Sequence, residues 1–171
     1  MTAQDETTST ESTRQETSHT PALLEAITKH PFFKGLTAEQ LSTLAECAML
    51  KKFEENELIC KEQEPANRFY LIQEGKVALE SEGIEGETVS IQTISAGEVL
   101  GWSWLFPPYH WHFNARATEE TRAIFFYGTR LREWCDRDHD LGYELIQRMA
   151  AAGIQRLQST RRRLVNSLSN R

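Results

Sequence analysis

The stretch FYLIQEGKVAL, residues 69–79, decides the fold class of this chain. Phe69 and Leu71 before the central Glu74-Gly75 pair, and Val77 and Leu79 after it, are spaced two positions apart. Alternation with a period of two is typical of a β-strand, and glycine between two such runs is typical of a tight turn. The stretch therefore predicts two strands joined by a turn.

The same alternation continues on both sides of this stretch. Breaks rich in Glu, Asn, Pro or Gly separate the short runs, and Thr121–Tyr127 forms one further predicted strand. Short strands with turn signals roughly every eight to twelve residues indicate an antiparallel sandwich or barrel. The apolar residues of the additional runs are Phe53, Leu58, Ile59, Val89, Ile91 and Ile94.

Helical patterns stand at both ends of the strand region. Residues 23–27 predict a short helix, and Thr37 with Gln40 three positions later forms a capping box before a second one. From residue 138 onward the pattern predicts one long helix with Asp140 as its N-cap. The predicted fold class is α+β: an antiparallel β-roll with short N-terminal helices and a long C-terminal helix.

The chain divides into three parts by composition. Residues 1–20 contain ten Ser or Thr and no Leu, Ile, Val or Phe. They cannot bury enough apolar surface to fold, so we expect a disordered tail. Residues 21–137 hold the short helices and the roll, and residues 138–171 form the long helix. That helix ends in a basic stretch, although the whole chain has a net charge of −6.

The long C-terminal helix carries a seven-residue repeat. Ala150, Leu157 and Leu164 recur every seven residues, with Ile154 one step aside. This spacing is typical of a coiled-coil seam, which Gly153 weakens. We expect a homodimer whose interface contains these four apolar residues. The alternative is that the helix packs along its own roll.

Five segments share their order and spacing with a known family. They are Phe32-Phe-Lys-Gly-Leu36, Phe69-Tyr-Leu-Ile72, Glu74-Gly75-Lys-Val77, Gly97-Glu98-Val-Leu-Gly101 and Ala115-Arg-Ala117. On these segments residues 31–168 resemble the cyclic-nucleotide-binding domain of the catabolite-activator-like (Crp/Fnr) regulators. The resemblance implies a β jelly roll with a ligand pocket and a regulatory role in signal transduction.

The resemblance also implies a phosphate-binding cassette at residues 97–117. In members that bind cyclic AMP, a Gly-Glu pair opens the cassette and an arginine pairs with the cyclic phosphate. Gly97-Glu98 fits the opening. Placing the last alanine of the family pattern on Ala117 puts Trp111 at the arginine position and His112 at the Ser/Thr beside it. This replacement argues against cyclic AMP binding, because a buried phosphate needs a charged partner.

The ligand site is expected to combine residues 97–101, at the start of this cassette, with Trp111 and His112, which stand at the replaced positions. Arg116 lies an odd number of residues from the arginine position, so strand alternation directs it to the opposite face. The expected guest is a cyclic nucleotide or another small ligand, with no metal. The predicted ligand-binding residues are Gly97, Glu98, Val99, Leu100, Gly101, Trp111 and His112.

The insert from Trp102 to Phe113 is the most aromatic segment and holds three of the four tryptophans. One interpretation is an aromatic-lined pocket with His110 or His112 as a polar group. The other is that these aromatics fill the roll as core, which would leave an interaction or scaffold protein. The sequence alone leaves both interpretations open.

Several function classes lack their motifs. The sequence contains no GxSxG, Walker A or GxGxxG pattern, so we expect no catalytic residues. Three cysteines without close spacing favour neither a disulfide framework nor a zinc site. No apolar run approaches the roughly 18 residues of a membrane span, and residues 1–20 lack the apolar core of a signal peptide. We therefore expect a cytoplasmic protein.

The basic run Arg161–Arg163 is expected to be a solvated helix face rather than a DNA contact. The DNA-binding relatives continue after this helix into a helix-turn-helix domain, for which the given sequence has no residues, so direct DNA binding is not expected. The prediction is a regulatory domain that acts through an unknown effector protein. The alternatives are a scaffold protein and a transcription regulator that reaches DNA through a partner.

Overall fold

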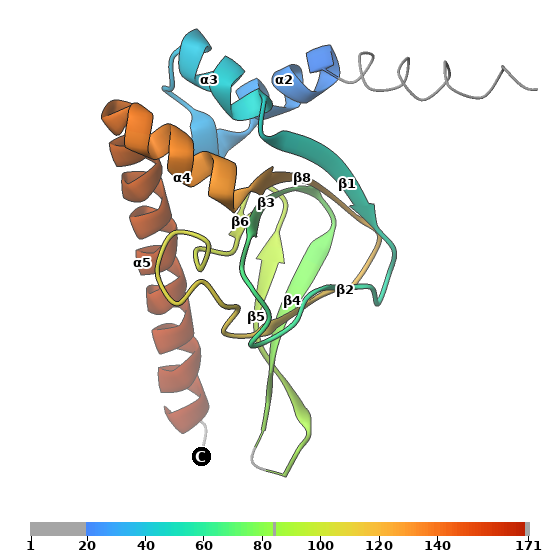
Figure 1. Cartoon of the computed structure of the whole chain (residues 1–171). Helices are drawn as coiled ribbons and strands as arrows, with labels where there is room; N and C mark the ends of the chain where they lie inside the picture. Colours follow the sequence, from blue (N-terminus) through green and yellow to red (C-terminus); the bar gives the residue numbers. More distant parts are fainter. Residues whose placement is uncertain (1–19, 84, 170–171) are drawn as a thin grey trace, which may run out of the picture.

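The computed structural model describes residues 20–83 and 85–169 of the 171-residue chain. Within them, two four-stranded antiparallel sheets form a roll, with helices before and after it in the chain (Figure 1). This confirms the predicted α+β class. The tail predicted to be disordered lies outside the described residues except for Thr20, which begins the first described helix.

The elements follow one another in an order of short helices, strands and helices. The N-terminal helices are α2 (Thr20–Lys29), the 3-10 helix η1 (Pro31–Phe33) and α3 (Ala38–Ala45). The strands are β1 (Ala48–Phe53), β2 (Leu58–Cys60), β3 (Arg68–Glu74), β4 (Lys76–Glu82), β5 (Thr88–Ser95), β6 (Val99–Leu100), β7 (Asn114–Ala117) and β8 (Thr121–Tyr127). The C-terminal helices are α4 (Gly128–Arg137) and α5 (His139–Ser169).

The chain changes sheets at the turn between β3 and β4. Strand β3 belongs to the sheet β1-β8-β3-β6, and β4 belongs to the sheet β2-β7-β4-β5. Gly75 makes the turn at a φ of 88°, in the left-handed region that favours glycine. A Cβ at this position would lie 2.5 Å from the carbonyl oxygen of Glu120. The predicted strand-turn-strand is therefore a corner between two sheets rather than a hairpin.

Strand β3 is buried on both faces, which the alternating pattern did not predict. Phe69 and Leu71 face the helices, while Tyr70 and Ile72 face the inside of the roll. The helices cover the outer face of this sheet, so both faces exclude water. Two cores result, and we call the one inside the roll the interior core. Its buried members are Phe53, Cys60, Ala66, Tyr70, Ile72, Val77, Leu79, Ile94, Leu100, Trp111, Phe113, Ala115, Ala117, Ala123 and Phe125.

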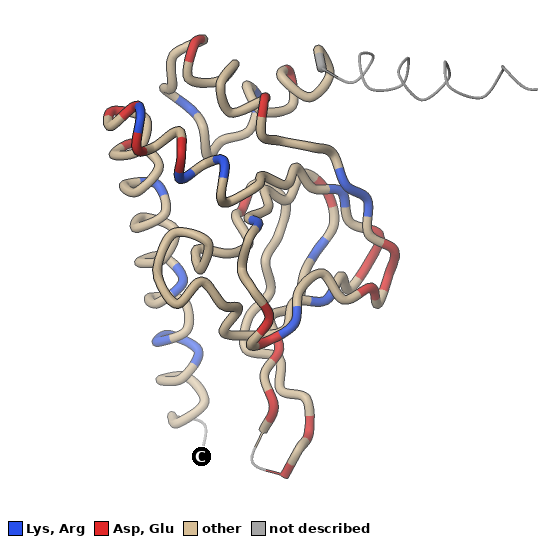
Figure 2. The backbone as a smooth tube through the Cα atoms, viewed as in Figure 1, with Lys and Arg blue, Asp and Glu red and all other residues tan. Residues whose placement is uncertain are grey.

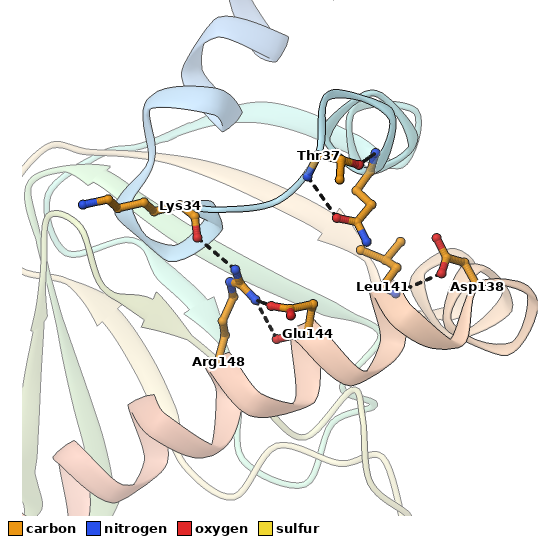
Figure 3. Close-up of polar contacts among 7 residues, drawn as sticks. Lys34, Thr37, Asp138, Leu141, Glu144 and Arg148 are labelled. Atoms are coloured by element: carbon orange, nitrogen blue, oxygen red, sulfur yellow. Dashed lines mark hydrogen bonds and ion pairs between the residues drawn. The ribbon is translucent and has the colours of Figure 1, made fainter.

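The helix caps are set by local hydrogen bonds (Figure 3). The capping box of Thr37 and Gln40 is confirmed. At the start of α5 the prediction is wrong by two residues, because Asp138 rather than Asp140 is the cap. Its Oδ1 accepts a hydrogen bond from the Leu141 N–H at 3.0 Å. Asp138 also ends α4, a separate helix before α5.

Helix α5 spans 31 residues, about 46 Å at 1.5 Å per residue. It runs beside the roll and continues past the part that contacts the core (Figure 1). Its buried residues are Leu141, Gly142, Leu145, Met149 and Arg156. Among the described helices, none is both long and apolar enough to cross a membrane.

Candidate ligand-binding site

Trp111 and Phe113 are core residues of the roll. The Trp111 side chain is only 4% exposed. A Cβ placed on Gly101 would lie 2.6 Å from its ring, so the indole occupies the space that glycine leaves. Its ring centroid is 6.0 Å from that of Phe113 and 6.5 Å from that of Tyr70. For Trp111 and Phe113 the structure agrees with the second interpretation of the aromatic insert, in which these aromatics fill the roll as core.

The histidines of the insert lie outside the interior core. His112 is exposed, because it alternates with buried residues on either side. His110 Nδ1 lies 2.8 Å from the Pro108 carbonyl oxygen, in the loop rather than in the roll. Neither histidine side chain therefore lies with the Trp111 ring in the interior core.

Arg116 faces outward, as strand alternation predicts. Its neighbours Ala115 and Ala117 are fully buried. The Arg116 Nε forms an ion pair with Glu80 at 3.2 Å, and Nη1 donates to the carbonyl oxygen of Asn56 at 2.9 Å. Its guanidinium is thus engaged on the outside of the roll and does not replace the missing arginine inside it.

A cavity of about 770 Å³ lies between α5 and the roll. Its walls come from η1, from β5, from the turn at residues 97–99 and from one face of α5. None of its lining residues belongs to the interior core, so this cavity is separate from the inside of the roll. The predicted ligand-binding residues therefore divide among three places.

The turn at Gly97-Glu98 forms one wall of this cavity. Gly97 has a φ of 85° and donates its N–H to the Ile72 carbonyl oxygen at 2.8 Å. The Glu98 carboxylate accepts from the Ser95 N–H at 2.7 Å, which orients it. Val99 completes the wall. The remaining predicted residues lie elsewhere: Leu100, Gly101 and Trp111 are buried in the roll, and His112 is on the surface.

Arg156 is the unexpected residue of the cavity. It is 6% exposed, and its Nη1 has no hydrogen-bond partner among residues 20–83 and 85–169. Its Cζ lies 5.1 Å from the centroid of the Trp102 ring, in a cation–π contact. Burial lowers the pKa of the guanidinium to about 10, opposed by the Glu98 carboxylate. Arg156 is therefore a buried cation at neutral pH.

The sequence carried a signal that Arg156 lies on the buried face of α5. Leu141, Leu145 and Met149 recur every four residues and face the core, and Ala152 and Arg156 continue that line. Residues on one face of a helix recur every three or four positions. An arginine on the buried face of an amphipathic helix requires a polar partner.

Two further arginines of α5 line the cavity and are already engaged. Arg148 forms an ion pair with Glu144, and its Nη2 donates to the Lys34 carbonyl oxygen at 2.9 Å (Figure 3). Arg163 donates to the Ile91 carbonyl oxygen on β5. These contacts join α5 to the elements on either side of the cavity.

The cavity has an excess of positive charge. The described part of α5 beyond Glu144 carries basic residues and no acidic ones (Figure 2). Lys34, Arg148, Arg156 and Arg163 line the cavity together with a single carboxylate, that of Glu98. The electrostatics favour an anionic guest.

The cysteines offer no nucleophile at neutral pH. Burial raises the pKa of Cys47 and Cys60 to about 12 and that of Cys135 to about 11, so all three are protonated thiols. Among the described residues, no group of three or more His, Cys, Asp or Glu side chains is placed to hold a metal ion.

Comparison with known proteins gives the family. Residues 50–138, from within β1 to the end of α4, match the cyclic nucleotide-binding domain. A protein from Geobacter metallireducens GS-15, named as a cyclic nucleotide-binding protein, is 35% identical. Its crystal structure superimposes with a TM-score of 0.70 over 78% of this chain and 96% of that chain.

Two more distant relatives are kinases or their subunits. Human cGMP-dependent protein kinase 2 is 23% identical over 139 residues, which are 81% of this chain and only 16% of the kinase. A regulatory subunit of a cAMP-independent protein kinase A from Trypanosoma brucei has a TM-score of 0.70 at 19% identity, over 88% of this chain and 53% of that one. The second likeness shows the fold alone. From the family match over half of its length and from the Geobacter relative, the chain belongs to the cyclic nucleotide-binding domain family.

Proposed function

We propose that this chain is a non-catalytic regulatory domain whose roll does not hold cyclic AMP. The observation that carries this proposal is the position of Trp111. The resemblance assigns that position to the arginine that pairs with the cyclic phosphate, and here a buried indole packs on Gly101 instead. A ligand there would lose both the space and a hydrogen bond to a charged group, which is worth about 1.5–3 kcal/mol.

The relatives support both parts of this proposal. Human cGMP-dependent protein kinase 2 is named for cyclic GMP, and the Geobacter metallireducens protein is named for cyclic nucleotide binding. The Trypanosoma brucei regulatory subunit belongs to a kinase named as cAMP-independent. That name is consistent with a domain of this fold that serves regulation without cyclic AMP.

A thermal-shift screen with cyclic AMP and cyclic GMP tests the proposal. A ligand at a hundred times its Kd stabilises a protein by about 2.7 kcal/mol, which moves the melting temperature by several degrees. We expect no shift at 100 µM of either nucleotide. A clear shift from cyclic AMP at micromolar concentrations would show that the roll binds it and that the proposal is wrong.

We further propose that α5 pairs with a second copy of itself. Ile154, Leu157 and Leu164 are 57%, 70% and 58% exposed, and Ala150 is exposed on the same helix. No residue of α5 after Arg156 is buried in the described chain. Burial of the helix against its own chain ends at Arg156. The second half presents an apolar stripe at seven-residue spacing, which suits an identical helix.

Interaction with an effector protein is the second candidate function. It is favoured by the same exposed stripe together with the filled roll, because both features fit a protein that contacts others through its surface. The two functions are compatible, since a dimer of α5 leaves the roll surface free for an effector.

A further inference from the structure

A single cation stands inside the apolar stripe of α5 that is proposed above to pair with a second copy. We propose that the two copies of α5 pair in opposite directions, so that the basic end of each helix lies against the acidic beginning of the other. This antiparallel arrangement rests on the proposed dimer and deepens it, because it fixes which residues of the two copies meet. A parallel dimer would overturn the arrangement and leave the proposed dimer intact.

The stripe extends beyond the four apolar residues described above, because Tyr143, Ile146 and Leu168 are exposed as well. Neighbouring members are three or four residues apart, which is typical of one face of a helix. The only longer step lies before Leu164, and the exposed Arg161 stands where the spacing continues. We call the whole line the seam. Its eight residues are Tyr143, Ile146, Ala150, Ile154, Leu157, Arg161, Leu164 and Leu168.

Parallel pairing would place like charges together. In a parallel pair each seam residue lies beside its own counterpart, so the Arg161 side chains of the two copies would meet within the contact. Arg162 and Arg163 follow directly and add charge of the same sign. The described part of α5 beyond Glu144 offers no carboxylate in return (Figure 2). Like charges repel, and a desolvated charge without a partner is costly, so parallel pairing is unfavourable at this end of the helix.

Antiparallel pairing about a point midway between Ile154 and Leu157 matches the seam residues by size. Ile154 of one copy then lies opposite Leu157 of the other, and the small Ala150 lies opposite Arg161. Ala150 leaves room for the aliphatic stem of Arg161, whose guanidinium reaches water at the edge of the contact. The remaining seam residues form two apolar pairs, Tyr143 with Leu168 and Ile146 with Leu164.

The charges along α5 also complement one another in this arrangement. Asp140 and Glu144 stand in the first two turns, whereas Arg161 and Arg162 stand near the end. Antiparallel pairing brings the two kinds of charge together at both ends of the contact. Glu144 already pairs with Arg148 of its own chain, so the attraction is between two charged regions rather than within one fixed ion pair. Electrostatic complementarity of this kind favours one direction of pairing over the other.

Cysteine cross-linking tests the direction of pairing. Ile146→Cys and Leu164→Cys are made in a Cys135→Ala background, because Cys135 is the native cysteine that is only half-buried. In the antiparallel dimer each of these residues is about 27 Å from its own counterpart along the axis, at 1.5 Å per residue. A disulfide needs Cα atoms within about 7 Å of each other. After subunit exchange and oxidation with oxidised glutathione, an equal mixture of the two variants should give a cross-linked dimer, and neither variant alone should.

The outcomes separate the direction of pairing from the dimer itself. Gln155→Cys is exposed on α5 outside the seam and measures cross-linking by random collision. A mixture that cross-links no faster than Gln155→Cys overturns the antiparallel arrangement, and so does a cross-linked dimer of Leu164→Cys alone. In the latter case sedimentation velocity would still show a wild-type dimer. A monomeric wild-type protein would instead overturn the proposed dimer, and the arrangement with it.

Two variants at Ala150 give a second readout. Ala150→Glu places a carboxylate opposite Arg161 of the other copy, and Ala150→Lys places a second cation there. Both substitutions put a long side chain of high helix propensity at the same exposed position, so they differ in the sign of the charge. We expect the dimer of Ala150→Glu to have a Kd about tenfold or more below that of Ala150→Lys. Equal Kd values, or a tighter dimer in Ala150→Lys, would show that Ala150 does not face Arg161 and would overturn the antiparallel arrangement.

Discussion

At the residue scale, one glycine and one tryptophan decide what the roll can hold. Gly101 leaves a space beside the backbone, and Trp111 fills it. Replacing Trp111 with the arginine of the family pattern would therefore do more than restore a charge. It puts a cation into a core that is already packed, without a partner.

Trp111→Arg should accordingly destabilise the protein without creating cyclic AMP binding. Truncating a buried tryptophan costs about 3–5 kcal/mol, and an unpaired charge adds to that cost. Urea denaturation gives the free energy of unfolding, and Trp111→Phe serves as the control with a smaller expected loss. Unchanged stability in Trp111→Arg, with tight cyclic AMP binding, would mean that the interior has room for a ligand.

His30 should make stability depend on pH. Its ring is 5% exposed, Nδ1 accepts from the Phe32 N–H at 3.3 Å, and Nε2 then donates to the Ile72 carbonyl oxygen at 3.3 Å. Burial lowers the pKa of His30 below its ordinary value of 6.5. The unfolded chain therefore binds a proton more readily than the folded one, so this contribution is complete above pH 6.5 and is lost as the pH falls below it.

Denaturation curves at pH 7.5 and pH 5.5 test this effect. The free energy of unfolding should fall between the two values, by up to about 1.4 kcal/mol for each unit that separates the folded and unfolded pKa of His30. His30→Gln should be less stable at pH 7.5 and should show a smaller fall. An equal fall in the variant would assign the pH dependence to other groups.

The thiols should be slow to react in the native protein. Burial raises the pKa of Cys47, Cys60 and Cys135 to about 12, 12 and 11, so little thiolate exists at pH 8. Iodoacetamide labelling followed by mass spectrometry should modify Cys47 and Cys60 only after unfolding, and Cys135 slowly in the folded state because it is half-buried. Rapid labelling of Cys47 or Cys60 in the folded state would contradict this placement.

At the element scale, α5 performs two tasks along its length. Its first half packs on the helices and the roll through Leu141, Leu145 and Met149. An exposed apolar stripe begins with Ala150 and Ile154 and continues through Leu157 to Leu164. Arg156 is the last buried residue of the helix, and the cavity-lining residues of α5 extend on both sides of it, from Arg148 to Arg163.

Leu157→Glu combined with Leu164→Glu should give a folded monomer. Each buried leucine contributes about 1.5–3 kcal/mol, and two carboxylates in the seam would repel those of the second copy. Sedimentation velocity should show a dimer for the wild-type protein and a monomer for the double variant. Gln158→Glu adds the same charge next to the seam and should remain dimeric. A wild-type protein that is monomeric at high micromolar concentration would contradict the pairing of α5.

At the scale of the whole molecule, the sequence predicted what depends on local pattern. The strand at Thr121–Tyr127 and the capping box at Thr37 were predictable because a few neighbouring residues determine them. The placement of Glu98 was not, because it depends on β6 and on how the chain changes sheets. A pocket between the Gly97 turn and the final helix was expected from the sequence, but its walls from η1 and β5 were not, since those segments lie far away in the sequence.

The central claim is that Trp111 fills the roll where relatives are expected to hold a cyclic phosphate. The most direct measurement is the NMR signal of the Trp111 indole N–H in ¹⁵N-labelled protein, assigned with Trp111→Phe, during titration with cyclic AMP. We predict that this signal does not move at millimolar nucleotide. A saturable shift of the Trp111 signal at micromolar cyclic AMP would show a ligand inside the roll and would contradict the claim.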